Sequence, residues 1–186
     1  LHKKCLGSFG ADGSGGAPGS FAQYRPVEKS TVSILSPWYL LPVLDLTTCE
    51  NFRPDLAQIA ERLDLSEAQV ADALAKLQAG GFLEWVDGTY RKVNLHIRFP
   101  ASESRQEVRT FHREMLRKAS NCLGKTSQAD YNRRLITGLT VAANPENIEL
   151  AKRRLNEALH EIGEILNQGP CTEVYQLNLQ MFPLTR

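Results

Sequence analysis

The side chains that most often catalyse reactions or bind metals are scattered along this sequence. His112 has no second histidine, nucleophile or carboxylate pair at a spacing typical of a catalytic site. A zinc site needs clustered ligands, and the cysteines form no Cys-x-x-Cys pair and have no histidine close by. We therefore expect no enzyme, no metal and no cofactor. We expect reduced, half-buried thiols at Cys5, Cys49, Cys122 and Cys171.

Polar residues between positions 53 and 92 have the types and spacing of contacts to nucleic acid. On the outer side of a helix, Gln69 could bond adenine and Lys76 guanine in the major groove. Near a tight turn, Arg91 and Lys92 could reach phosphates, which supply most of the affinity for DNA. The candidate contacts to double-stranded DNA are Arg53, Ser66, Gln69, Lys76, Tyr90, Arg91 and Lys92.

A second basic set lies further along the chain. The net charge of the whole sequence is +1, yet residues 101–134 hold eight Lys/Arg against four Asp/Glu. Four of these bases recur every fourth residue, on the flank of a predicted helix: Arg105, Arg109, Arg113 and Arg117. A solvated charged face is the ordinary interpretation of such a row, and a contact to an anion or to DNA is the alternative.

The elements that position the first set follow from hydrophobic periodicity and from turn signals. Ser36 and Pro37 are typical of a helix start, as is Pro54, and Ser66 is a favoured N-cap. Asp87-Gly88 is a strong hairpin signal. We predict helices at 37–48, 54–63 and 66–79 and strands at 82–86 and 90–95, which is the order of a winged helix-turn-helix.

The rest of the chain predicts a small α+β lobe. Its elements are a helix at 103–123, a strand at 135–143, a helix at 145–167 and a strand at 173–182. A right-handed crossover would let the two strands share one sheet. The fold class is thus α+β, with a flexible Gly/Ser-rich segment at 1–23, a winged helix at 24–99 and a dimerisation or regulatory lobe at 100–186.

Composition and apolar surface define the expected surroundings. Hydrophobic residues make up 42% of the 186 and charged residues 23%, as in an ordinary globular protein, and the expected reduced thiols favour a cytoplasmic location. No apolar run has the length of a membrane span, so we expect no membrane partner. The helices at 37–48, 103–123 and 145–167 carry more apolar surface than a small protein can bury, which predicts a symmetric homodimer.

Several stretches resemble one bacterial family. They are Trp38-Tyr39, Ile59-Ala60 with Leu63, Leu77 through Leu83, Phe111-His112-Arg113 with Met115-Leu116, Gly138-Leu139-Thr140, Val174 to Asn178 and Phe182-Pro183-Leu184. The chain from about residue 38 to 186 resembles winged-helix transcriptional regulators that are abundant in predatory bacteria and known mainly as a domain of unknown function. The resemblance implies a role in regulating transcription.

The charge of the would-be reading helix leaves two interpretations open. Residues 66–79 include Glu67 and Asp72 against a single Lys76, and a net negative helix repels DNA. Binding could depend instead on residues 90–92 and on the arginine row of a dimer. Alternatively, the winged helix contacts another regulatory protein and does not bind DNA.

Overall fold

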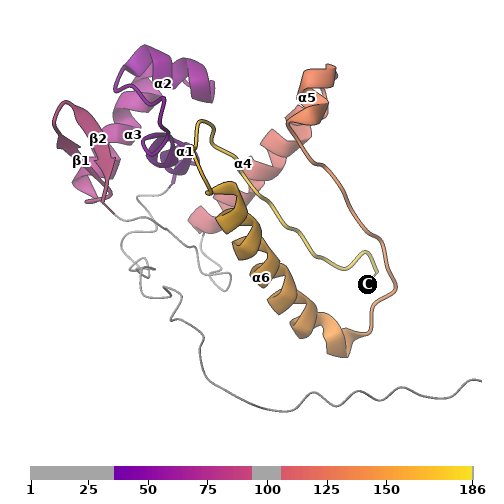
Figure 1. The fold of residues 1–186 in the computed structure, drawn as a ribbon. Helices are drawn as coiled ribbons and strands as arrows, with labels where there is room; N and C mark the ends of the chain where they lie inside the picture. Colours follow the sequence, from indigo (N-terminus) through magenta and orange to yellow (C-terminus); the bar gives the residue numbers. More distant parts are fainter. Residues whose placement is uncertain (1–35, 94–105, 186) are drawn as a thin grey trace, which may run out of the picture.

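The computed structural model describes residues 36–93 and 106–185 (Figure 1). The predicted segment 1–23, Cys5 and Arg105 lie outside these residues. The first described stretch contains α1 (Leu40–Leu46), α2 (Leu56–Leu63), α3 (Glu67–Ala79), β1 (Leu83–Val86) and β2 (Thr89–Lys92). The second contains α4 (Gln106–Cys122), α5 (Gln128–Asn132), the short 3-10 helix η3 (Pro145–Asn147) and α6 (Ile148–Leu166). Helices together with a two-stranded antiparallel sheet confirm the α+β class.

The core of the protein is built by α1, α2, α3 and the start of the hairpin. Leu40 and Leu44 of α1, Ile59 of α2, and Val70 and Leu77 of α3 are almost fully buried against one another. Their spacing of three and four residues places them on one side of each helix, as the sequence predicted. This three-helix and hairpin unit holds α3 in a fixed position with its opposite side open to solvent.

Local signals fix the ends of α2 and α3. Asp55 is the N-cap of α2 and accepts a hydrogen bond from the backbone N–H of Gln58. Ser66 caps α3, as predicted, and forms a reciprocal capping box with Gln69. Gly81 follows α3 with a φ of 71°, a conformation that glycine adopts without steric cost.

Two predicted helix starts were wrong by a few residues. The first helix begins at Leu40 behind Tyr39, and Pro37 lies in the preceding turn, where its carbonyl accepts a hydrogen bond from the N–H of Leu40. The second begins at Leu56 because Asp55 supplies the capping carboxylate, so Pro54 lies before the helix. In both cases a turn occupies the residues next to the proline.

The hairpin has the predicted turn. Asp87 and Gly88 both have positive φ, as the favoured two-residue turns require, and β1 pairs antiparallel with β2. The register places Glu84 opposite Arg91 and Trp85 opposite Tyr90. Because side chains alternate along a strand, Arg91 and Lys92 point to opposite faces of the hairpin.

The lobe that follows differs from its prediction in its strands. Residues 135–143 and 173–182 form no strand, so the predicted shared sheet was wrong. Alternating apolar residues are necessary for a half-buried strand, but a ladder also needs a partner at hydrogen-bonding distance. Neither segment has one among the described residues, although Arg133, two residues before the first segment, pairs with Glu173 (3.3 Å) at the start of the second.

The helices of the lobe lie close to their predicted places. Val108, Phe111 and Met115 of α4 are buried. Asn144 caps the turn at η3, from which α6 continues. The short helix α5 was not predicted, although Ser127 three residues before Asp130 is a capping signal, and Ser127 does cap α5. No residue of α6 is buried.

The chain after α6 returns to the three-helix and hairpin unit. The carbonyl of Cys171 accepts a hydrogen bond from the N–H of Glu50 (2.9 Å), and that of Thr172 accepts one from Arg62. Val174 packs against the core of that unit. In Figure 1 the yellow segment after α6 bends over toward α1 before it continues to the C-terminus. Among residues 36–93 and 106–185, no helix combines the length and apolar character that a membrane crossing requires.

Candidate nucleic-acid interface

The side of α3 that faces solvent is short of basic residues. Its outward charged positions are Glu67 and Lys76, with Asp72 half-buried between them. Ser66 and Gln69 form the helix cap: the Gln69 carbonyl oxygen accepts hydrogen bonds from the N–H of Ser66 (2.9 Å) and from its hydroxyl (3.2 Å). These two candidates therefore hold the helix end, which leaves the amide NH₂ of Gln69 as its group for an external contact.

Asp72 connects α3 to the start of α1. One of its carboxylate oxygens accepts hydrogen bonds from the Tyr39 hydroxyl (3.3 Å) and from the Lys76 ammonium (2.7 Å). Burial, followed by the Asp72 charge, raises the pKa of the Tyr39 phenol above its ordinary 10.0. The hydrogen bond to Asp72 raises the pKa of Lys76. Asp72 thus anchors the helix, and its charge is largely compensated by Lys76.

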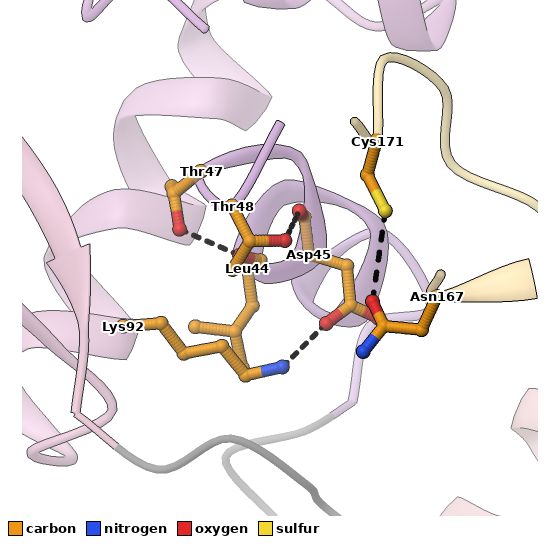
Figure 2. A network of polar contacts seen from close by, with 7 residues as sticks. All are labelled: Leu44, Asp45, Thr47, Thr48, Lys92, Asn167 and Cys171. Carbon is orange, nitrogen blue, oxygen red and sulfur yellow. Dashed lines mark hydrogen bonds and ion pairs between the residues drawn. The ribbon is translucent and has the colours of Figure 1, made fainter. Parts of the chain in front are cut away.

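The two basic residues of β2 have different surroundings. Lys92 turns toward α1, where its ammonium lies 2.6 Å from the carboxylate of Asp45 (Figure 2), and its side chain is only 8% exposed. Arg91 points outward with 59% of its side chain exposed, and the carboxylate of Asp87 lies 4.0 Å away. Arg91 is therefore the basic side chain of the hairpin that a phosphate could approach.

Two other candidates lie at the edges of the same unit. The ring of Tyr90 packs edge-on against Trp85 across the strands, at 4.7 Å between centroids, so its ring belongs to the packing of the hairpin. Arg53 lies in the turn before α2 and is exposed.

The arginine row lies on the solvent side of α4. Arg109, Arg113 and Arg117 are exposed, and Arg117 pairs with Glu114 at 2.8 Å. The next residue, Lys118, points elsewhere: its ammonium lies 3.6 Å from the ring centre of Trp38. Successive helix residues are rotated by about 100°. The arginine row therefore faces away from the side of α4 that contacts Trp38.

Sequence reasoning missed three residues that shape this surface. Tyr39 donates a hydrogen bond to Asp72, and Asp45 forms an ion pair with Lys92. The ammonium of Lys118 lies over the ring of Trp38 and so connects α4 to the turn before α1. Desolvation in that contact lowers the pKa of the Lys118 ammonium. The strand alternation at residues 91–92 was a signal that only one of the two could face outward. The long-range partners carried no signal in the sequence.

Among the described residues, no group of His, Cys, Asp and Glu could hold a metal ion. The elements together define an α+β protein in which a three-helix and hairpin unit is followed by a mainly helical lobe. The chain belongs to the family described as a domain of unknown function (DUF4423), whose model matches residues 20–184. Comparison with curated proteins and with solved structures found no match.

Proposed function

We propose that the three-helix and hairpin unit is a winged helix and that the protein is a homodimeric, DNA-binding regulator of transcription. The observation that carries the proposal is the way α3 is presented: α1 and α2 bury one side of it, while its other side is open and followed directly by the hairpin. This is the order in which winged-helix proteins place a recognition helix in the major groove and a wing beside it.

In this proposal, phosphate contacts come mainly from Arg91 and Arg53, which are both exposed. Lys76 contributes only when DNA phosphates compete with Asp72 for its ammonium. That is a small number of contacts for one protomer, so a dimer that doubles them is part of the proposal.

A second candidate function follows from the same charges. The outer surface of α3 and the hairpin carries Glu67, Glu84 and Asp87 beside Arg91, and it forms no continuous positive face in the described part of the chain. Acidic surfaces repel DNA and suit a protein partner. The second candidate is therefore a winged helix that contacts another protein of a regulatory system without binding DNA.

A mobility-shift titration of the full chain with genomic duplex fragments, at two salt concentrations, tests the first proposal. We expect binding that weakens with salt, and Arg91→Ala should reduce the slope of log K against log salt by about 0.9. Lys92→Met is the matched control, because the neighbouring ammonium is already bound to Asp45 and its removal should leave the slope unchanged.

Asp72→Asn gives a third measurement. It removes one negative charge and releases Lys76, so non-specific binding should tighten. If the wild-type chain does not retain duplex DNA at low salt, or if Arg91→Ala and Asp72→Asn both leave retention unchanged, this surface does not bind DNA. The second candidate then becomes the leading function.

A further inference from the structure

The lobe after α4 exposes most of its large apolar side chains. In α6, which is 19 residues long, Leu155 is 38%, Ile162 41% and Leu166 51% exposed. The extended segments on either side of α6 are more exposed still, with Leu139 at 87% and Phe182 at 68%. Such a surface is unusual for a protein that remains alone in water.

Apart from Leu150 and Ile165, the apolar residues of α6 lie on one side of the helix. They recur at intervals of three and four residues, so they form a single stripe. Its members are Ile148, Ala151, Leu155, Ala158, Leu159, Ile162 and Leu166. The described chain partly covers Ile148, Ala151, Ala158 and Leu159, whereas Leu155, Ile162 and Leu166 are exposed, so the stripe keeps apolar surface open to a partner.

The charges of α6 are divided between its two halves. Three consecutive bases, Lys152, Arg153 and Arg154, outnumber Glu149 in the first half, whereas Glu161 and Glu164 lie in the second and Glu157 lies at the middle. The last turn contains no base. Acids near a helix C-terminus oppose the helix dipole, so this division does not stabilise an isolated α6.

An antiparallel second copy of the same helix accounts for both features. It would bring the basic half of each helix to the acidic half of the other, and it would cover the two stripes with each other. We propose that α6 pairs with α6 of a second copy in antiparallel orientation, around a twofold axis near Ala158. The inference rests on the homodimer of the proposed function and identifies its interface; it does not depend on DNA binding.

Helix geometry gives the pairing in detail. With the axis near Ala158, Leu155 lies opposite Leu159 of the partner subunit and Ile148 lies opposite Leu166 of the partner subunit. Arg154 and Glu161 border the stripe on the same flank, because they are seven residues, or two turns, apart. Antiparallel pairing places Arg154 next to Glu161 of the partner subunit, twice in each dimer. Within a single chain, the Arg154 guanidinium lies 3.0 Å from the carboxylate of Glu157, and the Arg154 side chain remains 76% exposed.

The available area is sufficient for a stable dimer. Taking roughly 180 Å² for each large apolar side chain at full exposure, those after residue 134 expose about 1,500 Å² per chain. A standard interface needs about 800 Å² from each partner. The helix stripe alone supplies less than that, so the second copy must also cover part of the segments at 135–143 and 174–184.

Sedimentation equilibrium of the full chain and of charge-reversed variants tests the pairing. We expect a wild-type dimer, and each of Arg154→Glu and Glu161→Arg should raise its dissociation constant about tenfold by placing like charges together. The double variant exchanges the two signs, so it should recover most of the wild-type affinity. Leu155→Asn should also weaken the dimer, and it should leave the fold intact because Leu155 is not in the core of one chain.

Arg153→Glu is the matched control. Arg153 is adjacent to Arg154 but lies on the side of α6 opposite the stripe, so its reversal should leave the dimer unchanged. A dimer that tolerates Arg154→Glu, or a double variant that is no better than the single ones, would overturn the α6 pairing and leave the homodimer standing. A wild-type monomer at tens of micromolar would overturn both the α6 pairing and the homodimer. DNA binding would then still be tested separately by the mobility-shift titration.

Discussion

Lys92 and Arg91 are neighbours in the sequence, and from the structure we expect their replacement by Met to lower the free energy of unfolding by different amounts. The Lys92 ammonium lies 2.6 Å from Asp45 and its side chain is 8% exposed, whereas the Asp45 side chain is 50% exposed. The pair therefore lies between a surface ion pair, worth at most about 1 kcal/mol, and a buried pair, whose disruption costs roughly 3–5 kcal/mol.

We expect Lys92→Met to lower the free energy of unfolding by about 1.5 kcal/mol, because water can reach Asp45 and Met retains most of the buried stem. For a chain of this size the midpoint of thermal unfolding should fall by roughly 3–6 °C. Arg91→Met removes an outward side chain that is 59% exposed, and its cost should stay below about 0.5 kcal/mol.

Urea unfolding followed by circular dichroism measures both variants under identical conditions. Asp45→Asn and the double variant with Lys92→Met complete a thermodynamic cycle. The double variant should cost less than the sum of the single ones, because the two side chains act on each other. Equal costs for Lys92→Met and Arg91→Met, or additive costs in the cycle, would refute the assignment of Lys92 to α1.

Three further predictions concern the same unit. Replacing Ser66 by Ala should cost about 1 kcal/mol in the free energy of unfolding by urea, and Asp at this position should restore most of it, since either oxygen caps α3. The raised pKa of Tyr39 means that its neutral phenol contributes stability that is complete below pH 10 and lost as pH rises through the folded-state pKa. Unfolding measured between pH 9 and about 11.5 should therefore depend less on pH in Tyr39→Phe, and ultraviolet titration of that variant should lack the phenol whose pKa is raised. Burial raises the pKa of the Cys49 thiol, so a maleimide should label it more slowly than the half-buried Cys171, as measured by mass spectrometry of peptides; equal labelling rates would contradict the burial.

The sequence alone was sufficient for the elements of the first unit. The helix at 66–79, the cap at Ser66 and the turn at Asp87-Gly88 are local features, and each is found at its predicted place. Such signals depend on residues within one or two turns of each other, so they can be recognised without knowledge of the fold. The helix starts near Pro37 and Pro54 were less certain because a proline also suits the turn before a helix.

Tertiary structure decided which candidate residues are available. Lys92 looked suited to DNA, but its ammonium group is held by Asp45, 47 positions away, whereas the Asp72 that holds Lys76 is only one helix turn away. Ion pairs over such distances leave no periodic trace in a sequence. The alternation of apolar residues at 135–143 and 173–182 did suggest strands, and it was misleading. It describes the side chains of one segment and carries no information about a neighbouring strand that would pair with it. The sequence determined where the helices, caps and turn of this protein form, because those depend on neighbours along the chain; the fold decided which charges face solvent and which apolar segments remain open, because those depend on residues that only folding brings together.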